Sequence, residues 1–389
     1  MGRRVVIVVL DGVGIGGGPD AAEFGDEGSN TLGNTARRVG GLKLQNLRSL
    51  GLGNISDIEG IPPVTVPDAS HGLMEERSAA KATLAGHWEM MGIVLEEPLP
   101  TYPEGLPEWV ILRFEEETDR KVIGNKPASG TQIIEELGPE QEESGAWIVY
   151  TSADSVFQVA AHTGVITLEE LYAGCERAYR MLIGEGQILV ERVIARPYHG
   201  KKGSYERENE NRQDYGITPP TEMYMDRIKS AGHEVVAVGK IQDIFDGRGI
   251  TEHLPAKPDD TAKVDAVRET LERTESGLIF ANLVDFDAKY GHRRDPYGMA
   301  ENLKRFDARV PELLDALTGE DLMIITADHG NDPTFKGTDH TRERVPLLVV
   351  GGDEPRNLGT RDSFADVGAT VAAWLMVNKN GLPGKSLLR

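Results

Sequence analysis

The chain has 389 residues, 39% of them hydrophobic and 27% charged, a length and composition typical of a globular protein with two domains. Its 63 acidic and 42 basic residues give a formal net charge of −21. Because such a surface repels nucleic-acid phosphates and anionic membranes, we expect neither as a partner, and the sequence indicates no protein partner.

Residues 4–10 form a short, apolar, β-branched run, which predicts a strand buried on both faces of a parallel sheet. Six consecutive apolar residues precede Asp11, too few for a signal peptide or a membrane span, so the expected location is cytoplasmic. The glycine-rich stretch 12–18 lacks the G-x-G-x-x-G spacing of a dinucleotide site, and an aspartate stands at the strand end instead.

Similar apolar runs recur along the chain and alternate with amphipathic segments. Strands are predicted at 146–151, 233–239, 277–284, 322–326 and 345–350, and helices at 261–276 and 298–319. Strands that alternate with helices in this way predict an α/β, doubly wound sheet.

The middle of the chain has a different pattern and is bracketed by prolines, at 98, 100 and 103 and again at 219 and 220. Such segments are typical of linkers into and out of an inserted domain. We predict a discontinuous core, residues 1–98 and 217–389, and an inserted α+β cap domain, residues 99–216. The single cysteine, Cys175, excludes an intramolecular disulfide and a zinc–thiolate cluster, and its helical spacing favours a core position over a nucleophile.

Carboxylate and imidazole side chains follow three of the predicted strands, at the edge where open α/β sheets bind ligands. These side chains are Asp11, then Asp285, Asp287 and His292, then Asp328, His329 and, further along the same loop, His340. The set suits Mn²⁺, Mg²⁺ or Zn²⁺, and it exceeds what one tetrahedral ion needs, so we predict two ions. The alternative is a polar loop that contains Asp and His by chance.

Thr83 precedes "LAGHWEMM", which predicts the start of a helix, so its hydroxyl would lie near the positive end of a helix dipole. A nearby metal ion could deprotonate that hydroxyl and make it a nucleophile. The alternative is an ordinary N-cap threonine, which the spacing alone favours.

Nine motifs, in order through nearly the whole chain, resemble the phosphopentomutase family of the alkaline phosphatase superfamily. They are "LDGVGIGGGPDA", "GSNTLGNTA", "KATLAGHWEMMG", "YTSADSVFQVAAH", "ARPY", "VGKIQDIF", "NLVDFDAKYGHRRD", "TADHGNDPT" and "GTDHTRERVPLL". The resemblance implies an alkaline-phosphatase-like core with an inserted cap. It also implies an isomerase of nucleoside and pentose phosphate metabolism, an intramolecular phosphotransferase that interconverts (deoxy)ribose 1-phosphate and 5-phosphate.

The resemblance further implies a phosphothreonine enzyme, a bisphosphate intermediate and two Mn²⁺ per chain, with Mg²⁺ or Zn²⁺ as substitutes and a sugar bisphosphate such as glucose 1,6-bisphosphate as activator. Residue by residue, one ion would be held by Asp11, Asp328, His329 and the nucleophile Thr83, and the other by Asp287, His292 and His340. Asp287 is preferred to Asp285 because it matches the second aspartate of the family's "DFD". Asp154 matches a position that contacts the sugar, and Lys240 matches the lysine of "VGK".

Basic residues gather between 192 and 212 of this acidic chain. Because an arginine fork suits a phosphate dianion, we predict that Arg196 and Arg207 bind the phosphate that is not being transferred. Lys201 and Lys202 are expected in a solvated loop.

Two departures from the family pattern are visible: Ala82 stands where Asp is more frequent, and "SNTLGN" stands where "SDTLGH" is more usual. Two rival functions follow from the same residues. One is a phosphatase or another mutase of the superfamily, such as cofactor-independent phosphoglycerate mutase, which favours a serine nucleophile. The other is a catalytically idle metal- or phosphosugar-binding protein.

Overall fold

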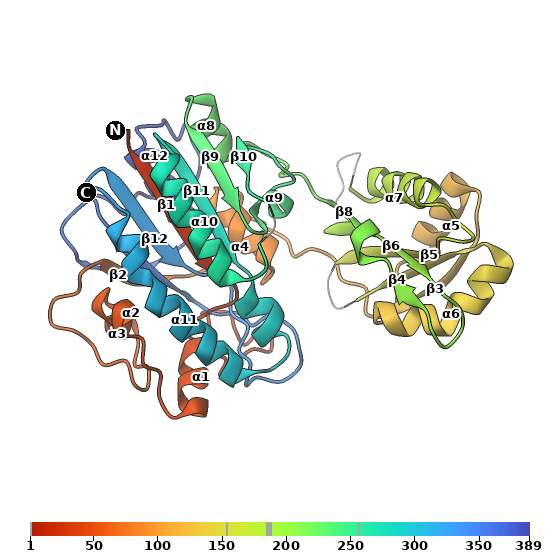
Figure 1. Ribbon diagram of the computed structural model, residues 1–389, viewed down its shortest axis with the longest axis horizontal. Helices are drawn as coiled ribbons and strands as arrows, with labels where there is room; N and C mark the ends of the chain where they lie inside the picture. Colours follow the sequence, from red (N-terminus) through yellow and green to blue (C-terminus); the bar gives the residue numbers. More distant parts are fainter. Residues whose placement is uncertain (1, 153–154, 184–188, 256) are drawn as a thin grey trace. The chain divides into compact units, whose positions relative to one another are not determined.

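The computed structural model describes residues 2–152, 155–183, 189–255 and 257–389 (Figure 1). The chain divides into two compact units. The core unit comprises Met1–Glu97 and Thr218–Arg389, and the inserted unit comprises Pro98–Ile217. These limits lie one residue from the boundaries that the prolines indicate.

The core unit contains, in the described residues, an eight-stranded mixed sheet (Figure 1). Its order is β10 (Glu252–His253), β9 (Glu234–Val238), β11 (Gly277–Leu283), β1 (Arg4–Leu10), β12 (Asp321–Thr326), β13 (Val345–Val350), β2 (Ser70–Met74) and β14 (Asn357–Arg361). The strands from β10 to β12 are parallel to one another, and β11, β1 and β12 are buried along their whole length.

The predicted strand at 345–350 forms as β13, but it is antiparallel to both β12 and β2, so the expectation of a parallel sheet is wrong for this strand. The connection from β12 to β13 contains no crossover helix, and parallel neighbours need one. A strand that is buried on both faces shows no alternation of polar and apolar residues, whether it is parallel or antiparallel to its neighbours. The residues of β13 therefore do not indicate the direction of the strand.

Helices cover both faces of the sheet, so the doubly wound α/β core is confirmed. One layer contains α1 (Thr31–Val39), α2 (Gln45–Ser49), α3 (Leu52–Ile55), α10 (Asp260–Arg273) and α11 (Pro296–Asp315). The other contains α4 (Thr83–Met90), α8 (Tyr224–Ser230), α9 (Ile241–Ile244) and α12 (Ala365–Trp374). Helices α10 and α11 begin before their predicted starts because Asp259 and Asp295 cap them, accepting hydrogen bonds from the Ala262 and Gly298 amides.

The inserted unit has its own mixed sheet, with α5 (Glu108–Thr118), α6 (Gly130–Ser144) and α7 (Leu168–Ile183) packed on it, which makes it α+β. The strand order is β3 (Val122–Pro127), β4 (Trp147–Thr151), β5 (Val156–His162), β6 (Arg192–His199) and β7 (Glu206–Arg207), and β8 (Gln213–Gly216) pairs with β6. The polar stretch after residue 198, expected as a loop, therefore contains two short strands, because each finds hydrogen-bonding partners along the edge of β6.

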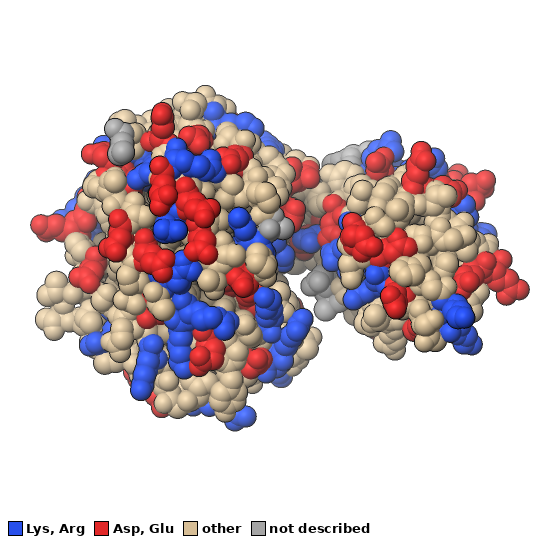
Figure 2. Space-filling model, in the orientation of Figure 1, with Lys and Arg blue, Asp and Glu red and all other residues tan. Residues whose placement is uncertain are grey.

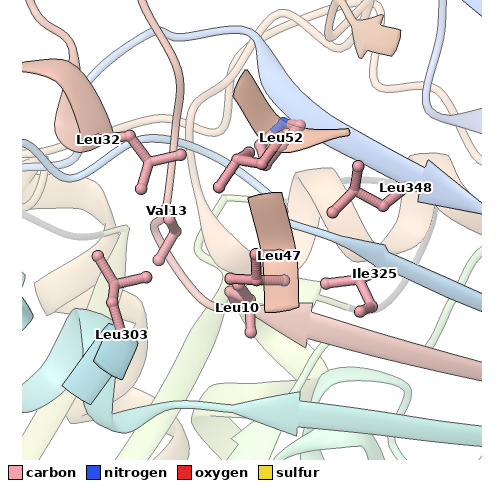
Figure 3. A pocket seen from close by; sticks show the side chains of 9 residues that line it. Leu10, Val13, Leu32, Leu47, Leu52, Leu303, Ile325 and Leu348 are labelled. Carbon is pink, nitrogen blue, oxygen red and sulfur yellow. The ribbon is translucent and has the colours of Figure 1, made fainter. Parts of the chain in front are cut away.

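A small apolar cavity of about 10 Å³ lies between the sheet and the helix layer that contains α1 (Figure 3). It is lined by Leu10, Val13, Leu32, Leu47, Leu52, Leu303, Ile325, Pro346 and Leu348. A water molecule needs polar partners, and these side chains offer none, so we interpret the cavity as a dry packing space beneath the loop after β1.

Charged side chains of both signs are interspersed over each unit on the face that Figure 2 shows. Ion pairs account for part of this pattern; for example, Arg309 of α11 pairs with Asp265 of α10 and Glu312. Among the described residues, no helix has the length and apolar character that crossing a bilayer requires.

We predict that Cys175 does not react with iodoacetamide in the native protein. Its side chain is fully buried in α7, and burial raises the pKa of the thiol far above its ordinary value. The reagent therefore cannot reach the sulfur, and the reactive thiolate does not form. Mass spectrometry should find the adduct only after unfolding in urea, with Cys175→Ala as the unlabelled control. Rapid labelling of the native protein would contradict the burial of this helix face.

Candidate metal centre

Parallel strands bring the predicted ligands to one edge of the core sheet. In β1 the last residue, Leu10, is in register with Leu283 of β11, and the preceding residue, Val9, is in register with Thr326 of β12. The three carboxyl ends therefore lie side by side, and the residues that follow them meet there. We call six of these residues the ligand cluster: Asp11, Asp287, His292, Asp328, His329 and His340.

Asp11, Asp328 and His329 form the first group, with one possible ligand atom from each residue within 4.8 Å of the others. His329 Nε2 lies 3.3 Å from Asp11 Oδ1 and 3.4 Å from Asp328 Oδ2, and all three side chains are buried. The structure therefore brings together the three residues expected at one metal ion.

Thr83 is the first residue of α4, and Ala82, not Thr83, occupies the N-cap position. The interpretation of Thr83 as an N-cap is therefore wrong. Its Oγ1 lies 3.1 Å from His329 Nε2, so the hydroxyl faces the first group.

Asp287, His329 and His340 form a second group with the same closeness of ligand atoms, so His329 belongs to both groups. His292 borders this group: its Nε2 lies 3.1 Å from Asp287 Oδ2 and 3.1 Å from His340 Nε2. Asp285, in contrast, contacts Lys289 and the amide of Asp260, so it braces the turn after β11 instead of joining the cluster.

Backbone carbonyls fix the orientation of all three histidines. His292 Nδ1 lies 2.7 Å from the Thr338 carbonyl oxygen, and His329 Nδ1 lies 3.0 Å from the Gly330 carbonyl oxygen. His340 Nδ1 lies 2.8 Å from the Lys81 carbonyl oxygen. A carbonyl accepts only, so each Nδ1 donates its hydrogen and each Nε2 faces the cluster. This is how protein structures usually orient histidine ligands of metal ions.

Two buried carboxylate oxygens in the cluster have no donor among the described residues, Asp11 Oδ1 and Asp328 Oδ2. The other oxygen of each carboxylate is engaged, because Asn282 Nδ2 donates to Asp11 Oδ2 at 2.8 Å and the Gly12 amide donates to Asp328 Oδ1 at 3.0 Å. Buried acceptors without donors are costly, and a divalent cation would satisfy both. The carboxylates and imidazoles therefore fit Mn²⁺, Mg²⁺ or Zn²⁺.

The electrostatics of the cluster favour positive charge between its carboxylates. Burial alone would raise the pKa of Asp287, but His340 and His292 outweigh it and hold that pKa well below the usual value. Burial alone would lower the pKa of His329, but Asp328 and Asp11 outweigh it and raise that pKa well above the usual value. The Asp287 carboxylate thus stays ionised, and its negative charge attracts a cation.

Several supporting residues were not expected from the sequence. His87 Nδ1 lies 3.2 Å from Asp328 Oδ2, and Asn282 contacts His87 Nε2 as well as Asp11. Asn331 donates to Asp287 Oδ1 at 2.7 Å. The one available signal was Asn282, an amide inside the otherwise apolar strand β11.

Arg294 braces the loop that ends at His340. It donates to Asn331 Oδ1 and to the carbonyls of Gly337 and Asp339, at 2.5, 2.6 and 2.9 Å. The same side chain therefore orients the amide that holds Asp287 and closes the neighbouring loop.

The predicted substrate contacts are more scattered. Lys240 follows β9 at the same sheet edge as the cluster, and Arg196 and Arg207 lie in β6 and β7 of the inserted unit. Asp154 lies outside the described residues. These four assignments stay predictions.

Comparison with known proteins places the chain among metal-dependent enzymes. The Metalloenzyme superfamily matches residues 3–379. A protein of Alkaliphilus metalliredigens named phosphopentomutase is 50% identical over 381 residues, 97% of this chain and 97% of that protein. One of Carboxydothermus hydrogenoformans with the same name is 53% identical over 371 residues, 95% of each.

A solved structure from Pyrococcus horikoshii resembles this chain with a TM-score of 0.51 at 13% identity, covering 98% of this chain and 99% of that one. At this identity the likeness concerns the fold alone. With the superfamily match, the core has the alkaline-phosphatase-like α/β fold that the family resemblance implied.

We predict one divalent cation for each of the two ligand groups in the wild-type chain, measured by elemental analysis after gel filtration. Asp328→Asn should lose one ion, whereas His329→Ala should lose tight binding of both, because His329 is common to the two groups. Asp285→Asn, at the same strand end, is the matched control and should retain both. A single ion in the wild type, or an unchanged metal content in His329→Ala, would contradict the assignment.

Proposed function

This chain belongs to the phosphopentomutase family of the Metalloenzyme superfamily, and we propose that it interconverts ribose 1-phosphate and ribose 5-phosphate, and the deoxyribose pair, through phosphothreonine. The family consists of isomerases that move a phosphoryl group within one molecule, and this chain is an enzyme of that class. The observation that carries the proposed mechanism is the 3.1 Å separation of Thr83 Oγ1 and His329 Nε2, which sets a hydroxyl beside the ligand cluster.

Two Mn²⁺ ions are the proposed occupants of the cluster, and Mg²⁺ or Zn²⁺ would suit the same donors. The proposed ligands are Asp11, Asp328 and His329 for one ion, and Asp287, His292 and His340 for the other, with His329 near both. When bound, the ions supply positive charge to the phosphoryl oxygens and favour the deprotonated hydroxyl of the nucleophile.

In the proposed cycle the resting enzyme carries a phosphoryl group on Thr83 Oγ1. The free hydroxyl of the sugar monophosphate attacks phosphorus, the bond from phosphorus to Oγ1 breaks, and the hydroxyl proton ends on Oγ1. The resulting 1,5-bisphosphate turns round and returns its other phosphoryl group to Oγ1, while the sugar oxygen that it leaves takes the proton back. The N-terminal end of α4 would favour the phosphorylated form, because its first amides and dipole attract an anion.

Escape of the bisphosphate would leave Thr83 without its phosphoryl group. A sugar bisphosphate such as glucose 1,6-bisphosphate would restore it, which makes such a compound the proposed activator. A phosphatase would not need one, because water completes its cycle.

A mutase must hold the phosphate that is not being transferred, and arginines of the inserted unit support such a site. Burial raises the pKa of Tyr150, and Arg196, Arg207 and Arg212 each oppose this rise, so all three guanidinium groups act on one phenol. A Cβ on Gly130, the first residue of α6, would lie 2.9 Å from the Tyr150 hydroxyl and 3.5 Å from Arg207 Nη1. Clustered guanidinium groups beside a helix N-terminus suit a phosphate dianion.

Lys240 and Asp154 are proposed to contact the sugar phosphate, on the basis of the motifs that they match. A cytoplasmic location also stays a prediction of the sequence.

The proposal is tested by ³¹P NMR of the purified, Mn²⁺-loaded protein with ribose 5-phosphate, with and without glucose 1,6-bisphosphate. We expect ribose 1-phosphate to appear, faster with the bisphosphate when the enzyme has first been dephosphorylated. Rapid release of inorganic phosphate without ribose 1-phosphate would identify a hydrolase, and no reaction would favour a binding protein.

Variants at the nucleophile complete this test. Thr83→Val removes the hydroxyl at nearly constant volume and should abolish turnover while the metal content stays unchanged. Thr83→Ser keeps a hydroxyl and should retain measurable activity. Mass spectrometry of the active enzyme should find the phosphoryl group on the peptide that contains residues 81–91, and its presence elsewhere would count against Thr83.

We predict that Arg196→Ala and Arg207→Ala each lower kcat/KM for ribose 5-phosphate by about tenfold or more, about 1.4 kcal/mol, because each removes a fork that holds the stationary phosphate. Lys202→Ala, an exposed cation in the same unit, is the control and should keep wild-type kinetics. Unchanged kinetics in both arginine variants would refute the gripping role.

A further inference from the structure

We propose that Arg342 is a positioning residue that holds the segment leading to Thr83, and with it the Thr83 hydroxyl, against the ligand cluster. This inference deepens the proposed function and rests on the role given there to Thr83. Residues 75–82 connect β2 to α4, and in the described chain they belong to no strand. Their side chains nevertheless alternate as in a strand, with Glu76, Ser78 and Ala80 buried.

The guanidinium of Arg342 takes the place of a neighbouring strand for this segment. Nη2 donates to the Glu76 carbonyl at 2.8 Å, and Nη1 donates to the Ser78 and Ala80 carbonyls at 2.8 and 2.5 Å. Alternate carbonyls of an extended segment point to one side, so one planar group reaches all three. Buried carbonyls need such partners, and here a single side chain supplies them.

Two amides of the same segment are held by α4 itself. Glu89 accepts hydrogen bonds from the Arg77 amide at 3.0 Å, from the Ser78 amide at 2.6 Å and from Ser78 Oγ at 2.7 Å. The segment is therefore bound both by Arg342 and by the helix that begins with Thr83. A shift of the segment would shift the start of the helix, where the hydroxyl is.

Arg342 is itself firmly held. Its side chain is 4% exposed and pairs with Asp20 Oδ2 at 2.9 Å and with Glu76 Oε2 at 2.7 Å. Its backbone amide donates to Asp26 Oδ2, the oxygen that also contacts Lys81 Nζ, both at 2.9 Å.

The loop that carries a predicted metal ligand and the segment that carries the nucleophile are therefore joined at several points. These include the Arg342 contacts, the 2.8 Å contact between His340 Nδ1 and the Lys81 carbonyl, and the 3.2 Å ion pair between Asp339 Oδ2 and Lys81 Nζ. His340 is two residues before Arg342. Because ligands and nucleophile come from sequence-distant segments, these contacts set the distance between them.

Lysine cannot replace the guanidinium of Arg342. The three hydrogens of a lysine ammonium are bound to one nitrogen, so they cannot reach three carbonyls and two carboxylates together. Arg342→Lys keeps the buried positive charge beside Glu76 and Asp20, so it tests the fork and not the charge. Arg344→Lys is the matched control. Arg344 lies two residues further along the same chain and also pairs with a glutamate, Glu75, but the backbone carbonyl to which its side chain donates is that of Gly17, outside the segment.

The experiment combines steady-state kinetics, metal content and hydrogen–deuterium exchange. Arg342→Lys should lower kcat by about tenfold or more while KM for ribose 5-phosphate stays within about threefold, because positioning acts on the chemical step. Bound Mn²⁺ should equal the wild-type value. In the metal-free protein, amide exchange over residues 76–83 should be faster in Arg342→Lys, and Arg344→Lys should match the wild type throughout.

Should Arg342→Lys fail to fold, Asp20→Asn provides a second variant, because it loosens the guanidinium from its more exposed side. It should change kcat and exchange in the same direction to a smaller extent. Wild-type kcat and exchange in the folded variant would overturn the proposal, and so would a fall in Mn²⁺ content that matches the fall in kcat. If the wild-type enzyme does not interconvert the ribose phosphates, the proposed function is wrong. The hydrogen–deuterium exchange of residues 76–83 in Arg342→Lys then still tests whether Arg342 holds the segment.

Discussion

Buried carboxylates at the ends of β1, β11 and β12 need positive charge between them, and the hydrogen bonds around them leave carboxylate oxygens facing that space. Asp11 and Asp328 each give one oxygen to a donor of the chain and leave the other without one among the described residues. The three histidines give Nδ1 to backbone carbonyls and keep Nε2 for the cluster. Because the described side chains supply no donor for these two oxygens, the cluster is built for a cation.

This requirement explains why so many polar groups are buried around the cluster. Asn282 donates to Asp11, while Asn331 donates to Asp287 and is itself held by Arg294. Each of these contacts restricts a ligand that would otherwise rotate away from its neighbours of like charge. Rigid support of this kind keeps ligand atoms in place before an ion arrives.

The sequence predicted those parts of the structure that leave a local trace. A buried strand that ends in an aspartate, as at Asp11 and Asp328, is visible in ten residues, and the caps of α10 and α11 moved only the ends of the expected helices. The sharing of His329 and the role of Arg342 have no local trace, because they depend on which distant segment lies opposite. Arg342 and Glu76 are 266 positions apart, and a single sequence shows that both are charged but not that they meet.

The direction of β13 and the two short strands after residue 198 were missed for the same reason. Burial determines whether a run of residues is apolar, whereas the partner strand determines direction and pairing. The cap arginines illustrate an intermediate case. Their charge in an acidic chain drew attention to Arg196 and Arg207, but their nearness to Tyr150 required the fold.

The division of the core unit into two chain segments has a consequence for biosynthesis. Strand β1 leaves the ribosome early, yet its two sheet neighbours, β11 and β12, begin 273 and 317 residues later in register with Arg4. The inserted unit, in contrast, is one continuous segment, and its sheet pairs entirely within Pro98–Ile217. Domains generally fold as units during synthesis, so the central strand of the core must wait, unpaired, while the inserted unit forms. The ligand cluster can then be completed only after His340 has been added to the chain.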